Sequence, residues 1–145
     1  MKKFIQIIHK KRLIAFIIKD NFKMKGVKFF TPDKFPQQLA YMNRPKGYLI
    51  NSHIHPPTAR QIKFTQEVLF IKKGKVRIDF YDKKTQYAES RLLEKGDIVF
   101  IVEGGHGFDF MKNTEIIEVK QGPFLKSSKP IRFEPVKKDK IKLKK

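Results

Sequence analysis

The residues on either side of Gly74 constrain the fold most strongly, because they carry the two-residue period of β-strands. Apolar side chains recur at every second position of residues 76–81, and Glu67 falls in register with the apolar side chains of residues 67–71. We therefore predict a β-hairpin that turns at Gly74. If the shared face is the core face, the Glu67 carboxylate points into the protein.

Short apolar runs bounded by turn residues recur along the rest of the chain, which favours an all-β protein. We predict no long amphipathic helix after residue 28. The strands predicted besides the hairpin are residues 27–30, 38–42, 48–55, 87–93, 98–102, 108–110 and 114–120. A series of this kind suits a jelly roll.

With 145 residues, the chain has the length of a single domain. We expect an N-terminal extension over residues 1–26, which has extra strands in one interpretation, followed by a β-barrel over residues 27–126 and a short basic tail over residues 127–145. Residues 1–23 are either an upstream extension of a shorter protein beginning at Met24 or an added strand pair. The sequence does not choose between these two interpretations.

The net charge of +19 is concentrated at the ends, with +8 in residues 1–28 and +6 in residues 129–145. Charge runs with few apolar residues are usually solvated, and we expect this for the tail. Lysine outnumbers arginine, whereas recognition of phosphates and bases favours arginine. Nucleic-acid binding is therefore not expected, although basic ends keep it as a weaker alternative.

The chain has no cysteine, so disulfides and thiolate metal sites are excluded. This composition fits a reducing compartment, and we expect a cytoplasmic protein. The apolar run at residues 13–18 is too short for a transmembrane helix and is followed by charged residues rather than a signal-peptide cleavage site. We therefore expect no membrane association.

Three of the four histidines and one glutamate suggest a metal site: His53, His55, Glu67 and His106. Residues two apart in a strand share a face, so His53 and His55 can project toward one point. Glu67 and His106 can reach the same point from other strands. Three imidazoles and a carboxylate suit a divalent transition metal. His9 lies outside this pattern, and we do not expect it to be a ligand.

Glycines at fixed distances extend the pattern. Gly47 is followed after five residues by His53 and then by His55, and Glu67 is followed after six residues by Gly74. This order resembles the first motif of the cupin superfamily, except that eleven residues separate His55 from Glu67, which is more than the family has. The departure implies a longer loop or a strand extension beside the site.

A second cupin motif is similar to the segment from Gly96 to His106. Val102 stands where the family has proline, and one residue is missing before the histidine. The resemblance covers residues 37–120. It implies a double-stranded β-helix, the jelly-roll barrel of cupins, holding zinc, iron, manganese or nickel through the three motif histidines and Glu67.

The resemblance also implies a small-molecule ligand. Small bacterial cupins lead us to expect a sugar or sugar nucleotide of polysaccharide-related metabolism, in an isomerase- or epimerase-like reaction. The alternatives are an Fe(II)-dependent dioxygenase and a non-catalytic protein that binds a small ligand. The sequence identifies no catalytic base and leaves open whether the protein is an enzyme.

Arg60 lies in the long gap and is a candidate for binding a substrate carboxylate or phosphate, with simple solvent exposure as the alternative. Tyr48, Phe108 and Phe110 either line the barrel mouth or belong to the core. We also expect a homodimer, because cupins of this size usually pair through a sheet edge and pairing covers exposed strand edges.

Overall fold

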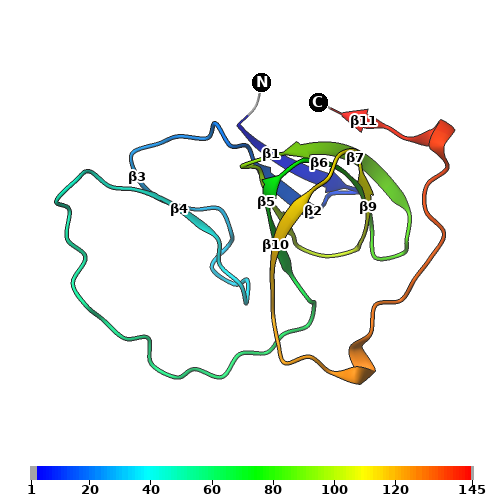
Figure 1. The fold of residues 1–145 in the computed structure, drawn as a ribbon. Helices are drawn as coiled ribbons and strands as arrows, with labels where there is room; N and C mark the ends of the chain where they lie inside the picture. The colour runs from blue at the N-terminus through cyan, green and yellow to red at the C-terminus, as the bar shows by residue number, and fades with distance from the viewer. Residues whose placement is uncertain (1–2, 145) are drawn as a thin grey trace. The chain divides into compact units, whose positions relative to one another are not determined.

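A computed structural model describes residues 3–144 of the chain (Figure 1). The all-β class predicted from the sequence is confirmed, since these residues contain no α-helix. The chain forms two compact units, one from the residues up to Phe22 and from Phe64 onward (unit 1), and one from Lys23 to Lys63 (unit 2). Within the described range, no helix has the length and hydrophobicity of a membrane span.

Unit 1 contains two sheets, whose strands are β1 (Phe4–His9), β2 (Arg12–Ile18), β5 (Glu67–Lys73), β6 (Lys75–Tyr81), β7 (Tyr87–Glu94), β8 (Ile98–Ile101), β9 (Gly105–Phe110), β10 (Glu115–Lys120) and β11 (Leu143–Lys144). The five-stranded sheet has the order β1-β2-β8-β5-β10, and the four-stranded sheet has the order β11-β7-β6-β9. All neighbours are antiparallel except β11 and β7. Two short 3-10 helices, η1 (Lys126–Ser128) and η2 (Lys138–Lys140), follow β10.

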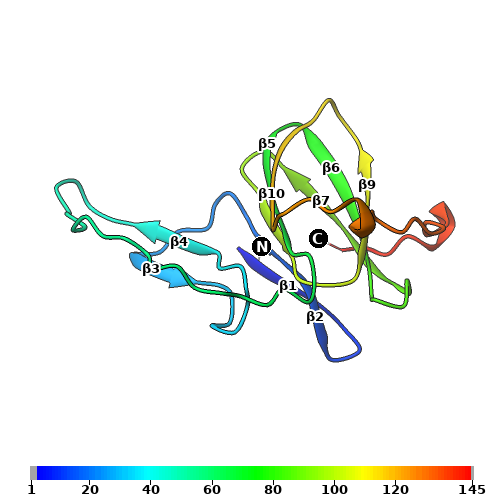
Figure 2. The ribbon, with the colours of Figure 1, turned by 90° about the horizontal axis from the view of Figure 1, so that it is seen from below.

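The two sheets of unit 1 pack face to face around one hydrophobic core (Figures 1 and 2). The core takes mainly alternate residues from the strands, as a two-residue period requires, and the irregular pairing of β1 with β2 adds the consecutive residues Ile14 and Ala15. Its members are Ile7, Ile14, Ala15, Ile17, Leu69, Ile71, Val76, Ile78, Phe80, Leu93, Val99 and Ile101. The strands remain in two separate sheets and do not close into one barrel.

β5 and β6 do not form the predicted hairpin, because they belong to different sheets. β5 pairs with β8 and β10, whereas β6 pairs with β7 and β9. Between them, Gly74 has a φ of 89°, and a Cβ there would lie 2.3 Å from the carbonyl oxygen of Asn113. The chain thus crosses from one sheet to the other at a residue that only glycine can occupy without strain. The strand period was predicted correctly, but it carries no information about the pairing partner.

Residues 4–18 form the first two strands of the five-stranded sheet. The structure therefore agrees with the added strand pair and not with an extension outside the domain. β1 and β2 form a hairpin whose turn residues Lys10 and Lys11 have φ values of 47° and 64°. β2 then pairs with β8, with Ala15 opposite Ile101. This segment therefore belongs to the same compact unit as the strands after Phe64.

The expected solvated tail, residues 127–145, is instead bound along the four-stranded sheet in its described part (Figure 1). The backbone N–H of Val136 donates to the Tyr81 hydroxyl at 2.9 Å, and that of Lys142 donates to the Tyr87 hydroxyl at 2.8 Å. β11 then pairs with β7. Most tail side chains are still exposed, so the charge run is solvated on one side while its backbone is fixed.

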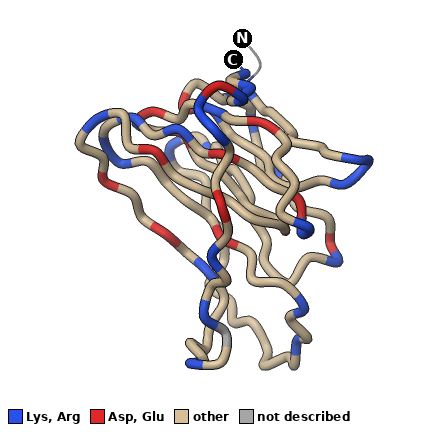
Figure 3. Tube along the Cα trace, turned by 90° about the vertical axis from the view of Figure 1, so that its right-hand side faces the viewer, with Lys and Arg blue, Asp and Glu red and all other residues tan. Residues whose placement is uncertain are grey.

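Lys and Arg residues occur along the whole described chain, with Asp and Glu residues among them (Figure 3). Several in unit 1 have a carboxylate partner, and the pairs include Arg12 with Glu103 at 2.5 Å, Lys75 with Glu94 at 2.6 Å and Arg77 with both Asp79 and Asp109 at 2.9 Å. Charged residues of both signs therefore occur throughout unit 1, although the excess of positive charge remains largest toward the two ends of the sequence.

Unit 2 contains one two-stranded antiparallel sheet, formed by β3 (Gly26–Phe29) and β4 (Ala40–Asn43). The loop between these strands is closed by the Thr31 hydroxyl, which donates to the Gln38 amide oxygen at 2.6 Å. Both strands fall where the sequence predicts them, within two residues.

The strand predicted over residues 48–55 is absent, because residues 44–66 form irregular chain. Prolines stand on both sides of the predicted strand, at Pro45 and Pro56. Proline has no backbone N–H and is confined to strand ends and edges, so it limits a sheet at these positions. The long gap between the two predicted ligand pairs is accordingly a loop and not a strand extension.

Candidate functional site

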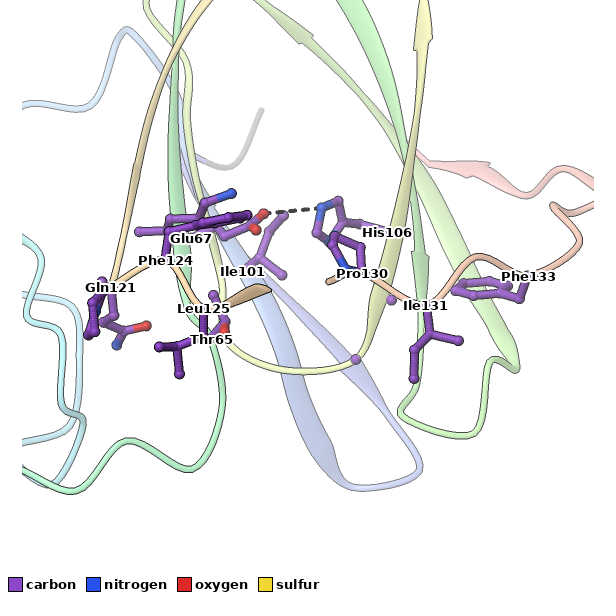
Figure 4. Close-up of a pocket in the computed structure, with 15 residues that line it drawn as sticks. Thr65, Glu67, Ile101, His106, Gln121, Phe124, Leu125, Pro130, Ile131 and Phe133 are labelled. Carbon is purple, nitrogen blue, oxygen red and sulfur yellow. Dashed lines mark ion pairs between the residues drawn. The ribbon is translucent and has the colours of Figure 1, made fainter. Parts of the chain in front are cut away.

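Glu67 and His106 meet between the two sheets of unit 1 (Figure 4). Glu67 begins β5 and shares its inner face with Leu69 and Ile71, as the sequence predicts. His106 is on β9 opposite the buried Phe80, which turns its imidazole toward the same interior. The Nε2 atom of His106 lies 3.1 Å from the Oε2 atom of Glu67.

The two glycines before His106 allow β9 to begin close to β6. Gly104 has a φ of 89°, and a Cβ there would lie 2.2 Å from the Tyr81 carbonyl oxygen. At Gly105 a Cβ would lie 2.6 Å from the Phe133 ring. Gly104 therefore excludes a side chain, which gives this position of the second sequence motif a structural reason, whereas at Gly105 the Phe133 ring would have to move.

The surroundings of Glu67 favour its ionised form. The hydrogen bond from His106 lowers the pKa of Glu67 most, partial burial opposes this, and the charges of His106 and Lys120 lower the pKa further. The Glu67 side chain is only 16% exposed and that of His106 24%, so water screens the interaction incompletely. The pair thus offers a partly buried carboxylate at neutral pH.

A pocket of about 570 Å³ opens beside this pair (Figure 4). One wall comes from the sheets, through Glu67, Ile101, His106 and Lys120. The other wall comes from the chain after β10, and its residues are mostly apolar: Pro123, Phe124, Leu125, Pro130, Ile131 and Phe133. A volume of this size is in the range that holds a small-molecule ligand.

His106 keeps one nitrogen without a partner. Its Nε2 faces Glu67, whereas its Nδ1 is buried and forms no hydrogen bond. When neutral imidazole donates Nε2–H to the carboxylate, Nδ1 carries the lone pair. Nδ1 is therefore an acceptor atom of the pair that forms no hydrogen bond within the described residues.

The separation of Glu67 and His106 also fits two ligands of one metal ion. Metal–nitrogen and metal–oxygen bonds are about 2.1 Å long, so two donor atoms at right angles lie about 3 Å apart. The observed 3.1 Å between Nε2 and Oε2 agrees with this value. An imidazole nitrogen and a carboxylate oxygen are donors that first-row transition metals accept.

His53 and His55 form a second pair, within unit 2. Their ring centroids are 5.2 Å apart, and His53 Nδ1 lies 2.9 Å from the carbonyl oxygen of Asn51. A hydrogen bond from Nδ1 to a carbonyl leaves Nε2 free as a ligand, which is common in metal sites. The four predicted ligands thus form two separate pairs, one in each unit, and no group of three or more suited to a metal ion occurs among residues 3–144.

The other residues that the sequence proposed for ligand binding lie outside the pocket. Arg60 is an exposed residue of unit 2, and its guanidinium donates to the Thr58 carbonyl at 3.4 Å. Tyr48, also in unit 2, is exposed and has the Arg44 guanidinium 4.4 Å from its ring centroid. Phe108 and Phe110 follow His106 on β9 and are 38% and 58% exposed. None of these residues lines the pocket.

Lys120 and Gln121 line the pocket, but neither was a site candidate from the sequence, in which Lys120 only ends the predicted strand 114–120. Lys120 lies opposite Glu67 in the register of β10 and β5. The Gln121 amide oxygen accepts the backbone N–H of Gln66 at 2.6 Å. Only the pairing of β5 with β10 brings Lys120 and Gln121 close to Glu67, and the two-residue period of a strand does not predict which strands pair.

Comparison with known proteins gives no relative, since no protein-family model, curated protein or solved structure matches this chain. Any functional conclusion therefore depends on the residues and geometry described above.

Proposed function

We propose that this protein is a metal-binding member of the cupin type that acts on a small molecule in the pocket of unit 1. The observation that carries the proposal is the 3.1 Å approach of His106 to Glu67, from opposite sheets, beside a pocket of about 570 Å³. Both residues hold the positions that the two cupin motifs give to metal ligands. The face-to-face sheets agree with a jelly-roll arrangement.

In this proposal His53, His55, Glu67 and His106 hold one divalent ion, which is zinc, iron, manganese or nickel. The ion supplies Lewis-acid polarisation of a ligand oxygen. Glu67 remains ionised beside Lys120, and this balance of charge orients a polar ligand. The reaction proposed is an isomerisation or epimerisation of a sugar or sugar nucleotide, in a reducing, cytoplasmic setting.

Metal analysis tests the proposal. The purified protein is stripped with a chelator and titrated with Zn²⁺, Fe²⁺, Mn²⁺ and Ni²⁺ by calorimetry, beside His53→Ala and His106→Ala. Loss of a ligand should weaken metal binding by at least about tenfold in each variant. His9→Ala is the matched control, because His9 lies outside the motifs, with Nε2 3.8 Å from Asp82.

Unchanged metal binding in both motif variants would reject the ligand set. Iron as the tightest-bound metal, together with oxygen uptake in the presence of a ligand, would favour the dioxygenase alternative. Metal and ligand binding without turnover would favour the non-catalytic alternative.

We also propose that the protein forms a homodimer through β10. This strand is at the edge of the five-stranded sheet, and its Ile117 and Val119 are 49% and 56% exposed. Unpaired edges with apolar side chains promote association. Ile117→Lys should give a monomer in sedimentation measurements if β10 is the interface, whereas an unchanged mass would reject it.

A further inference from the structure

Gln121 has a fixed amide orientation and an unused hydrogen-bond donor. Its Oε1 accepts the backbone N–H of Gln66 at 2.6 Å. Because only the amide oxygen can accept from an N–H group, the positions of Oε1 and Nε2 cannot be exchanged. The Nε2 atom is buried and has no hydrogen-bond partner, although Gln121 lines the pocket. Buried donors normally have an acceptor, so Nε2 of Gln121 is a donor that an oxygen atom of a bound ligand can use.

Lys120, the residue before Gln121, brings a positive charge to the same pocket. It lies opposite Glu67 across β10 and β5, and both residues line the pocket. Its ammonium group is 2.8 Å from a Glu118 carboxylate oxygen, in a pair that is about half exposed. An exposed ion pair is weak and exchanges readily with another anion. Lys120 can therefore turn toward an anionic group of a ligand.

The second wall of the pocket offers apolar surface to the rest of the ligand. Phe124, Leu125 and Ile131 line the pocket and are 79%, 51% and 91% exposed. The apolar face of a sugar ring suits such a surface, with aromatic rings as preferred partners. The pocket thus has a polar corner and an apolar side.

We propose that Lys120 and Gln121 recognise a carboxylate, so that the ligand of this pocket is a carboxylated sugar. This inference rests on the proposed small-molecule function of the same pocket and specifies its ligand class. Among the described pocket residues, Lys120 is the one lysine, and none is an arginine. Its ammonium group is thus the permanent positive charge of the pocket lining. One ammonium and one amide N–H match a single carboxylate, whereas the diphosphate of a sugar nucleotide would be expected to recruit arginine.

The test compares D-glucuronate with D-glucose by calorimetry on the full-length protein, with and without bound metal. The two sugars have the same ring and differ in the carboxylate. Gln121→Glu keeps an oxygen for the Gln66 N–H and replaces only the unused donor with an anion. We expect glucuronate to bind more tightly than glucose, and the variant to lose at least roughly tenfold in glucuronate affinity, the effect of one charge-assisted hydrogen bond.

Lys120→Met should weaken glucuronate binding by a similar factor and leave glucose binding unchanged. Lys75→Met is the matched control, because Lys75 also forms an ion pair, with Glu94 at 2.6 Å, but lies outside the pocket. Thermal unfolding of each variant verifies that the fold is intact.

Equal binding of both sugars, absence of glucuronate binding to the wild-type protein, or unchanged affinity in Gln121→Glu would overturn the inference. A wild-type protein that prefers glucuronate but binds no metal would reject the metal centre and retain the carboxylate site. The two proposals therefore fail separately.

Discussion

The Phe133 ring packs edge-on against Tyr81, with 5.0 Å between ring centroids and 80° between ring planes. The Tyr81 hydroxyl also accepts the backbone N–H of Val136 at 2.9 Å. Phe133 belongs to the apolar wall of the pocket. One tyrosine of the four-stranded sheet thus holds the segment that forms this wall.

Tyr81→Phe should loosen that segment without unfolding unit 1. The variant retains the ring contact with Phe133 but loses the hydrogen bond from Val136, which is worth about 1 kcal/mol. Hydrogen exchange should become faster in residues 134–142, and the free energy of unfolding should fall by about that amount. Tyr48→Phe, at an exposed residue of unit 2, is the control. Unchanged exchange in the tail would show that other contacts fix it.

Gly104→Ala should destabilise the protein by about 2 kcal/mol or more, because the residue has a φ of 89° and a Cβ would meet the Tyr81 carbonyl oxygen at 2.2 Å. Gly107→Ala is the matched control on β9, since a Cβ there meets no atom within 4 Å. Denaturant unfolding of both variants measures the difference. Similar losses at the two positions would contradict the strain argument.

Glu89, on β7 of the four-stranded sheet, contacts two cationic side chains. Its carboxylate is 2.6 Å from Arg91 and also contacts Lys144 of β11. Glu89 is 4% exposed and Arg91 9%, so Glu89→Ala removes a carboxylate from a buried guanidinium and should cost about 3 kcal/mol or more. Lys144→Ala removes a mostly exposed partner and should cost about 1 kcal/mol or less. Equal costs in chemical denaturation would refute this ranking.

Stability should depend on pH through Glu103. The hydrogen bond from Arg12 lowers the pKa of Glu103 most, and the charge of Arg12 lowers it further against the effect of burial. Since the folded pKa is below the unfolded value of about 4.3, the stabilisation is fully present above that pH and is lost as the pH falls through the folded pKa. The difference in melting temperature between the wild type and Glu103→Gln should therefore shrink below about pH 4. A difference that stays constant with pH would rule out this pair as its source.

Local patterns predicted strands well where apolar and polar residues alternate. The segment 76–81 became β6, and Glu67 lies on the inner face of β5 as expected. The hairpin between them was wrong, because Gly74 changes sheets and the two-residue period is the same for any partner. The strand predicted over residues 48–55 was wrong because its flanking prolines outweigh a weak apolar pattern.

Long-range contacts account for what the sequence did not predict. The tail lacks an apolar pattern, and its backbone donates hydrogen bonds to the hydroxyls of Tyr81 and Tyr87. Hydrogen bonds to single tyrosine hydroxyls leave no periodic pattern in the sequence from which they could be predicted. The role of Gln121 depends on the hydrogen bond that its amide oxygen accepts from the Gln66 backbone N–H, 55 residues away in the sequence. The four-residue metal centre stays a prediction. Of its four ligands, Glu67 and His106 lie 3.1 Å apart in unit 1.

The strand order of the five-stranded sheet has a consequence for synthesis of the chain. β2, which ends at Ile18, has β8 as its inner neighbour, and β8 begins only at Ile98. About eighty residues must therefore leave the ribosome before β2 can find this partner. Sheets built from such distant segments form slowly, so we expect the five-stranded sheet of unit 1 to form only after β8 has been synthesised.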